Sequence, residues 1–240
     1  MAAVVELVEA NVRFGGTVAL DHLSLRVEHG EALGIVGPNG AGKTTLCDVL
    51  SGDLRPTSGR VFLHGENVTD LGPAPRARRG LARTTRPPAP FAGLTAFENC
   101  LVGATFATPL GRRARRRACL DVLERTGLVP VADVAAAALA PFEQRRLELA
   151  RALVTGPSVL VLDELAGGLA AAEVDELVAI VSEVHRSGVA IVWVEHVVVA
   201  LAEIADRLMA IDFGRKFADG EPGQVMSSAD VQRVHLGSDP

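Results

Sequence analysis

The sequence predicts an α/β fold with a mostly parallel β-sheet core. Its second half alternates short apolar runs with longer amphipathic stretches, and the runs at residues 32–36, 158–162 and 189–194 are apolar at nearly every position. Such runs are typical of strands buried on both faces, and strands that alternate with helices pair in parallel. With 240 residues, 48% of them hydrophobic, the chain can form one domain or one domain with an inserted subdomain.

The first third of the chain predicts an antiparallel β subdomain beside this core. Residues 4–8 and 18–27 are β-like runs separated by a glycine turn. Residues 56–71 predict a hairpin with turns at Ser58-Gly59 and His64-Gly65. Strands joined by such short turns pair in the antiparallel direction.

The middle of the chain predicts a helical subdomain inserted into the core. After a Pro/Arg-rich passage at 73–90, residues 96–155 are rich in alanine and have a helical character. We therefore place the insertion at 86–155, and the core with its β subdomain at 1–85 and 156–240. The last part is expected to alternate again: strand 158–162, helix 172–186, strand 189–194, helix 197–206 and strand 208–211.

A phosphate-binding motif lies between a predicted core strand and a predicted helix. Residues 37–45 match G-x-x-x-x-G-K-[ST], and the helix after them is expected over 44–50, ending at Ser51-Gly52. Glycines let the backbone turn tightly and aim its N–H groups at phosphate oxygens, helped by the helix dipole. A chance match is the alternative, but the flanking strand and helix favour the motif. The predicted nucleotide-binding residues are Gly37, Pro38, Asn39, Gly40, Ala41, Gly42, Lys43, Thr44 and Thr45.

Side chains for nucleotide hydrolysis are predicted in both halves of the chain. Lys43 is expected to reach the β- and γ-phosphates, and the Thr44 hydroxyl to ligate Mg²⁺. Asp163 and Glu164 follow an apolar strand, so they lie at the carboxyl edge of the sheet, where ligands bind. There Asp163 is expected to hold magnesium and Glu164 to act as general base, while His196, after the next strand, contacts the γ-phosphate. By itself, an Asp-Glu pair after a strand is more often a capping or surface pair, and a histidine at a strand end is usually a surface residue; the phosphate loop is what favours catalysis.

Composition and charge argue against several other classes of protein. No signal sequence and no apolar stretch of membrane-spanning length occurs, so we expect a soluble chain. Cys47, Cys100 and Cys119 lack metal-ligand spacing and favour free thiols in a reducing cytosol. The net charge of −5 gives no general basis for binding nucleic acid. The arginine run at 112–117 favours a solvated helix, with contact to acidic lipid or a partner as the alternative.

Further passages carry a family resemblance over essentially the whole chain, at residues 12–21, 94–99, 143–153 and 212–216. With the phosphate loop, they resemble the nucleotide-binding subunits of ATP-binding cassette (ABC) transporters, most of all those of branched-chain amino acid importers. The resemblance implies a P-loop NTPase fold of the ABC ATPase type, ATP and Mg²⁺ as cofactors, ATP hydrolysis coupled to transport, and integral membrane permease partners. It also implies a peripheral location on the cytoplasmic face of the cell membrane. Phe14 would stack on adenine, whereas taken alone it would be a buried core aromatic.

The chain departs from the family at the signature motif, Leu-Ser-Gly-Gly-Gln/Glu-Gln, where residues 139–144 are Leu-Ala-Pro-Phe-Glu-Gln. In the family this segment closes over the ATP that a second subunit holds, using a serine hydroxyl, glycine N–H groups and a helix N-terminus. Ala140 lacks the hydroxyl, Pro141 lacks an N–H, and Phe142 is expected to place a bulky ring where close approach is needed. Hydrogen bonds to charged groups contribute about 1.5–3 kcal/mol each, so this closure is weakened.

Three other departures from the family pattern also affect contacts with magnesium or with a partner subunit. Arg86 stands at the position of a glutamine that touches magnesium, and a cation cannot ligate a metal ion. Residues 165–170 lack the family's proline and polar residue, and Val197 replaces an aspartate after His196. We therefore expect a heterodimer in which a second ABC ATP-binding subunit supplies an intact signature. The alternative is a pseudo-ATPase, a regulatory module that binds ATP with little or no hydrolysis.

Overall fold

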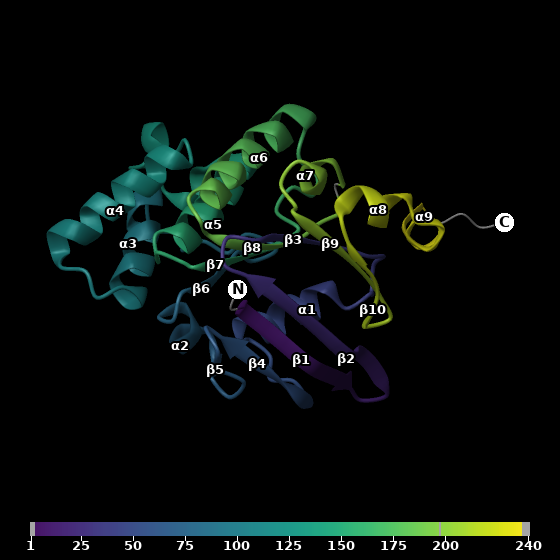
Figure 1. The fold of residues 1–240 in the computed structure, drawn as a ribbon. Helices are drawn as coiled ribbons and strands as arrows, with labels where there is room; N and C mark the ends of the chain where they lie inside the picture. The colour runs from purple at the N-terminus through teal and green to yellow at the C-terminus, as the bar shows by residue number, and fades with distance from the viewer. Residues whose placement is uncertain (1–2, 197, 237–240) are drawn as a thin grey trace.

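The structure, a computed structural model, describes residues 3–196 and 198–236. Within these ranges the strands form one four-stranded and one six-stranded sheet. Figure 1 shows the six-stranded sheet in the middle, with α5 (Pro141–Leu153), α6 (Ala171–Arg186) and α7 (Val198–Ala202) on one face. The opposite face carries α1 (Lys43–Ser51) and the four-stranded sheet. No described helix is both long enough and apolar enough to cross a membrane.

The six-stranded sheet confirms the predicted parallel core. Its order is β10-β9-β3-β8-β7-β6, and every pair is parallel except the β9/β10 hairpin. The predicted strands are β3 (Ala32–Val36), β7 (Val159–Asp163), β8 (Ala190–Val194) and β9 (Arg207–Asp212). The two edge strands, β6 (Leu81–Arg83) and β10 (Arg215–Gly220), were not predicted from the sequence.

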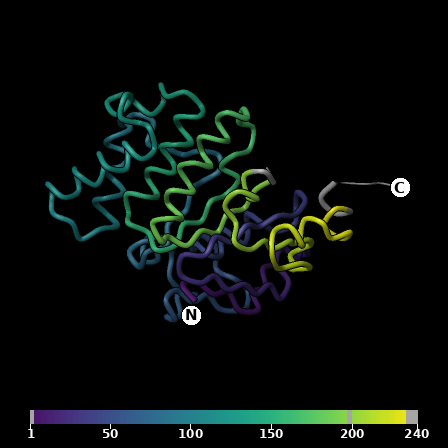
Figure 2. Tube along the Cα trace, turned by 45° about the horizontal axis from the view of Figure 1, so that its top comes forward, coloured from purple at the N-terminus to yellow at the C-terminus, as the bar shows by residue number. Residues whose placement is uncertain are grey.

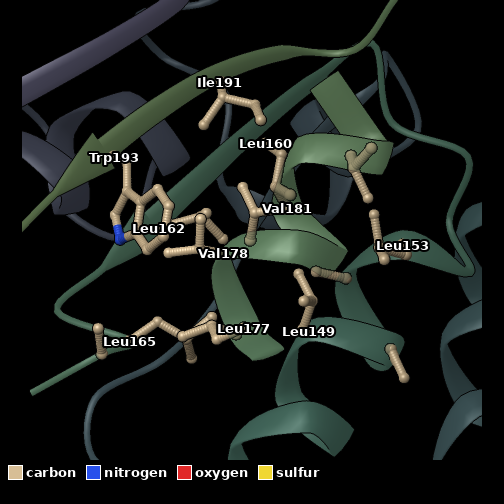
Figure 3. Packing of buried hydrophobic residues seen from close by; sticks show 14 of the residues in the cluster. Leu149, Leu153, Leu160, Leu162, Leu165, Leu177, Val178, Val181, Ile191 and Trp193 are labelled. Atoms are coloured by element: carbon tan, nitrogen blue, oxygen red, sulfur yellow. The ribbon is translucent and has the colours of Figure 1, made fainter. Parts of the chain in front are cut away.

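Alternate residues of the core strands pack into two separate hydrophobic clusters. On β7, Leu160 and Leu162 belong to the cluster that includes α5 and α6, whereas Val159 and Val161 belong to the cluster that includes α1 and the four-stranded sheet. Figure 3 shows the first cluster, with Leu160, Leu162 and Trp193 against Leu177 and Val178 of α6. Both faces of the sheet are therefore buried, and this explains why the strands are continuously apolar.

The four-stranded sheet has the order β2-β1-β4-β5 and is antiparallel, as predicted. Its strands are β1 (Ala3–Phe14), β2 (Thr17–Glu28), β4 (Ser58–Leu63) and β5 (Glu66–Asn67), with the predicted turn at His64-Gly65 between the last two. The turn predicted at Ser58-Gly59 was wrong, because both residues begin β4. Gly59 has φ +98°, and a Cβ there would lie 2.5 Å from the Glu9 carbonyl oxygen, so its glycine serves a close approach to β1.

Three helices occupy most of the segment predicted as a helical insertion: α3 (Ala96–Ala107), α4 (Arg112–Arg125) and α5. Figures 1 and 2 place α3 and α4 at one end of the molecule and the short helices α8 (Pro222–Ser227) and α9 (Ala229–Leu236) at the other. The remaining helical pieces are α2 (Pro73–Ala77) and two 3₁₀ turns at Val129–Val131 and Ala136–Ala138. Helix α7 ends at Ala202 and is shorter than the helix predicted over 197–206.

Candidate nucleotide-binding site

The phosphate loop borders a cavity of about 280 Å³. The loop contributes Asn39, Gly40, Gly42, Lys43, Thr44 and Thr45, and the start of β2 contributes Thr17, Val18 and Ala19. Arg86 and Glu164, both far away in the sequence, complete the lining. The fold thus brings the loop and a predicted catalytic carboxylate to one cavity at the carboxyl edge of the central sheet, where α/β folds bind their ligands.

Close packing on both sides of the loop accounts for two of its glycines. A Cβ on Gly37 would lie 2.2 Å from the Ile211 carbonyl oxygen of β9, and one on Gly42 would lie 2.4 Å from the Ala19 carbonyl oxygen of β2. Gly42 is also the N-cap of α1, with φ +102°, and no side chain caps this helix. The first N–H groups of α1 therefore have no side-chain acceptor, and a helix N-terminus of this kind attracts a phosphate group.

Lys43 is folded back on its own loop. Its Nζ donates hydrogen bonds to the carbonyl oxygens of Gly37 at 2.7 Å and Pro38 at 2.8 Å, and the residue is only 5% exposed. Burial lowers the pKa of Lys43 to about 8, Asp163 works in the opposite direction, and the Arg86 charge lowers it further. The buried ammonium group is thus electrostatically suited to a strongly negative ligand.

Asp163 and Glu164 lie where β7 leaves the sheet. Asp163 is 1% exposed; its Oδ2 accepts a hydrogen bond from Arg83 Nη2 at 2.9 Å, whereas its buried Oδ1 has no hydrogen-bond partner. Glu164 has φ +46°, and its N–H donates to the Val194 carbonyl oxygen at 2.8 Å, which fixes its backbone beside β8. Both carboxylates face the phosphate-loop side of the sheet.

Two basic side chains engage the Glu164 carboxylate. Arg86 Nη1 forms an ion pair with Oε2, and His196 Nε2 lies 2.8 Å from Oε1. This histidine contact is not a hydrogen bond, and the buried Nε2 atom has no hydrogen-bond partner. Burial and the charges of Lys43 and Arg86 lower the pKa of His196, against a smaller opposite effect of Glu195. The imidazole is therefore neutral near pH 7.

The oxygen atoms at this site fit a magnesium ion. Asp163 Oδ1 is a buried carboxylate oxygen without a partner, and Thr44 lines the cavity together with Glu164, the residue next to Asp163. Carboxylate and hydroxyl oxygens, completed by phosphate oxygens and water, are the usual ligands of Mg²⁺ in nucleotide sites. When bound there, the ion would neutralise charge on the phosphates.

Comparison with known proteins agrees with this geometry. Residues 20–167, more than half of the chain, match the family described as ABC transporter. The chain belongs to this family. The ABC cassette is 36% identical over 249 residues to the high-affinity branched-chain amino acid transport ATP-binding protein BraF of Pseudomonas aeruginosa, covering 98% of each chain. It is also 36% identical over 241 residues to LivG of Escherichia coli K12, a protein of the same description, covering 94% of each chain.

Solved structures support the same assignment of fold. The cassette superposes on the ADP conformation of MJ1267, an ATP-binding cassette of an ABC transporter, with a TM-score of 0.90 and 27% identity. The match covers 99% of this chain and all of that one. A nucleotide-free cassette from an ABC transporter matches equally well, with a TM-score of 0.90. The predicted fold, a P-loop NTPase of the ABC ATPase type, is therefore confirmed, and the cassette is an ATPase of this family.

The signature segment begins α5, as the family resemblance implies, but one expectation about it was wrong. Phe142 does not project toward a partner: it is 8% exposed, and the Arg146 guanidinium lies 4.6 Å from its ring centre. Its ring belongs to the hydrophobic cluster that includes α5 and α6. Ala140 is the exposed N-cap and Pro141 the first helical residue, so the missing hydroxyl and N–H remain as predicted.

The segment after Asp163 and Glu164 is held by hydrogen bonds from within the cassette. The Ala166 N–H donates to Glu195 Oε1 at 2.6 Å, and Trp193 Nε1 donates to the same oxygen at 3.2 Å. Ala170 is the N-cap of α6 and has no side-chain acceptor. Val197 lies outside the described residues.

Phe14 is neither buried nor part of the cavity lining. It ends β1, is 54% exposed and pairs across the hairpin with Thr17, which does line the cavity. The buried-core alternative is therefore wrong. Stacking of Phe14 on adenine stays a prediction.

Sequence reasoning missed two charged residues that hold the site together. Arg83 donates to Asp48 Oδ1 at 2.5 Å as well as to Asp163, and so ties α1 to β7. Glu148 of α5, 3% exposed, accepts hydrogen bonds from Thr85 Oγ1 and the Ala89 N–H, both at 3.0 Å, and so fixes the segment that carries Arg86. The sequence signal for Glu148 is its place between two leucines of a predicted helix. The structure buries both leucines fully.

Proposed function

We propose that this cassette binds and hydrolyses Mg-ATP to drive the import of branched-chain or related amino acids. It does so as one half of a dimer with a different ABC ATP-binding subunit, bound to permease subunits at the cytoplasmic face of the membrane. The observation that carries the proposal is an asymmetry within one chain. Most of the phosphate loop lines one cavity together with Glu164, whereas the segment that would close over a partner's ATP lacks two of its donors.

The roles of the site residues follow from their positions. Backbone N–H groups of residues 37–45 and the α1 N-terminus hold the phosphates, with Lys43 moving from its loop carbonyls to the β- and γ-phosphates. Thr44 and Asp163 would hold Mg²⁺. Glu164 orients the attacking water and accepts its proton, and neutral His196 beside it contacts the γ-phosphate.

The two composite ATP sites of such a dimer would differ in strength. ATP on this chain's loop meets the partner's intact signature, whereas ATP on the partner's loop meets Ala140 and Pro141. Without the serine hydroxyl and one backbone N–H, the second site loses two hydrogen bonds to a charged ligand, each worth about 1.5–3 kcal/mol. One site therefore turns over and the other is degenerate.

A groove of about 630 Å³ between α2, β6, α3 and α5 is the proposed contact with the permease. Thr85 and Phe91, on either side of the proline-rich residues 87–90, line it, and Phe91 is 47% exposed with the Arg151 guanidinium 5.1 Å from its ring centre. Arg83 also lines the groove while it binds Asp163. A movement in the groove can thus reach the magnesium ligand through a single side chain.

The pseudo-ATPase alternative is supported by the ion pair of Arg86 with Glu164. A carboxylate held by a guanidinium is a poor general base, because the ion pair stabilises its charged form. Single-turnover hydrolysis with an excess of the complete transporter over ATP separates the two functions. The importer function predicts release of phosphate that Lys43→Ala abolishes, and the alternative predicts bound, intact ATP.

Uptake in cells tests the transport function. We expect deletion of the gene to lower uptake of radiolabelled leucine, and the unmodified gene to restore it. Lys43→Ala should not restore uptake, since its product lacks the phosphate-binding ammonium group. Unchanged uptake of leucine, isoleucine and valine in the deletion strain would contradict the proposed substrate class and leave the ATPase assignment intact.

A further inference from the structure

Arg86 is a cation at the position where the family has a neutral glutamine that touches magnesium. Its side chain is 55% exposed, and it lines the same cavity as Lys43, Thr44 and Glu164. In the described residues, Lys43 and Arg86 are the cationic side chains of this lining. Two positive groups therefore face the space that a triphosphate would occupy.

The contact that Arg86 makes here blocks one step of the reaction. Its guanidinium pairs with Glu164 Oε2, and His196 lies beside the other carboxylate oxygen. The Glu164 side chain is only 6% exposed, and its Oε2 is occupied by the ion pair with Arg86. To accept a proton from water, Glu164 must first be separated from Arg86.

The terminal phosphate of ATP is suited to cause this separation. If Glu164 is the general base, its carboxylate must lie next to the γ-phosphate, so the arginine on that carboxylate lies within reach of the same phosphate. The γ-phosphate carries more negative charge than a carboxylate and offers several oxygens to the planar, forked guanidinium. The segment around Arg86 is a loop anchored at Glu148, and 55% of the Arg86 side chain is exposed, so solvent rather than protein surrounds much of it.

We propose that Arg86 is a further nucleotide-contacting residue, which exchanges the Glu164 carboxylate for the γ-phosphate of bound ATP and so frees the general base only when that phosphate is present. After hydrolysis, ADP lacks the phosphate that holds Arg86, and the ion pair with Glu164 forms again. The inference rests on the proposed ATP site. Through this exchange, the arginine that stands in place of the family's glutamine distinguishes ATP from ADP.

Nucleotide affinities of the purified chain test this exchange without turnover. Binding of AMP-PNP, a non-hydrolysable ATP analogue, and of ADP is measured by calorimetry for the parent, Arg86→Met and Arg86→Lys. We expect Arg86→Met to weaken AMP-PNP binding about tenfold, the scale of one charge-assisted hydrogen bond, and to leave ADP binding unchanged. Arg86→Lys, which keeps the charge without the fork, should be intermediate. The exposed Arg55, paired with Asp70 outside the cavity, supplies the control Arg55→Met, which should change neither affinity.

The outcomes separate this proposal from the one on which it rests. A parent chain that binds neither nucleotide contradicts the ATP site and the role of Arg86 together. If the parent binds both nucleotides, the ratio of its affinity for AMP-PNP to its affinity for ADP should fall in Arg86→Met. A ratio that stays the same or rises overturns the role of Arg86 alone.

Removing the carboxylate gives an independent measurement. Glu164→Gln should strengthen AMP-PNP binding more in the parent than in the Arg86→Met background, because only the parent must break the ion pair before Arg86 reaches the phosphate. A gain that is equal or smaller in the parent means that Arg86 stays on Glu164 in the bound state, which overturns the exchange. Thermal melting of each variant identifies any loss of protein stability that Arg86→Met causes by itself. The Glu164→Gln comparison tests the exchange in that case too, because both of its measurements in the Arg86→Met background carry the same loss.

Discussion

At the scale of single residues, Lys43 gives nucleotide binding a defined pH dependence. The pKa of its buried ammonium group is about 8 in the free protein, and bound phosphates raise it. Affinity for ATP is therefore full below about pH 8 and falls as the pH rises through that value, by up to about tenfold per pH unit. Calorimetry between pH 7 and 9.5 in two buffers of different ionisation enthalpy should detect the matching proton uptake. The same slope in Lys43→Met would contradict the assignment.

Arg83 is expected to contribute to stability through the charges it neutralises. Its side chain is 12% exposed and its partner Asp163 1% exposed, so removing the guanidinium leaves a buried carboxylate without a counter-charge. Arg83→Met should lower the free energy of unfolding by about 3–5 kcal/mol in urea denaturation. Arg55→Met breaks an exposed pair and should lower it by less than about 1 kcal/mol. Equal effects of the two substitutions would show that Arg83 is not an internal counter-charge.

Residue positions in the site were predictable only where chemistry is encoded locally. The phosphate-loop motif lies within nine consecutive residues, and Asp163 and Glu164 come directly after an apolar run that predicts a strand ending at the same edge of the sheet. Arg83 was not predictable, because its partners Asp48 and Asp163 are 35 and 80 residues away. Arg86 was predicted to be a lost magnesium contact, but its ion pair with Glu164 depends on the tertiary packing of two loops.

At the scale of elements, the N-termini of α5 and α6 share an incomplete capping box. Glu143 Oε2 accepts the Ala140 N–H at 2.8 Å, and Glu173 Oε2 accepts the Ala170 N–H at 2.9 Å, but neither alanine can return a hydrogen bond. Serine at either N-cap would complete the motif. Ala140→Ser and Ala170→Ser should each raise the free energy of unfolding by about 1 kcal/mol.

Urea denaturation of these variants is compared with Ala137→Ser, an exposed alanine that is not a cap. No gain at the two N-caps, or an equal gain at Ala137, would mean that the helix ends are already satisfied by other means. Ala140→Ser also restores the hydroxyl of the family's signature, so a stability gain shows that the alanine was not retained for folding.

Core elements could be predicted because burial on both faces leaves a continuous apolar pattern, as in β7 and β8. The edge strand β10 was missed because most of its side chains are exposed, so its sequence carries no such pattern. The turn at Ser58-Gly59 was mistaken because a glycine that permits a close strand contact has the same sequence signal as a turn glycine. Phe142 was misplaced for a related reason, since the sequence does not show which side of a helix start faces the core.

At the scale of the whole molecule, the cassette keeps its phosphate loop and Glu164 at one cavity, whereas its signature segment lacks the serine hydroxyl and one backbone N–H. The cavity residues come from the phosphate loop with the start of α1, from β2, from Glu164 just after β7, and from the segment before α3. The α5 N-terminus cannot complete a second copy's site with the family's donors. The molecule should therefore pair with an unlike subunit rather than with itself.

Size-exclusion chromatography of Glu164→Gln with Mg-ATP tests this central claim most directly. If Glu164 is the general base, as proposed, the variant should keep any ATP-closed dimer assembled. We predict that it binds ATP but elutes as a monomer alone, and that it elutes as a dimer once a cassette subunit with an intact signature is added. A homodimer of Glu164→Gln, together with brisk ATP hydrolysis by the unmodified chain on its own, would contradict the account.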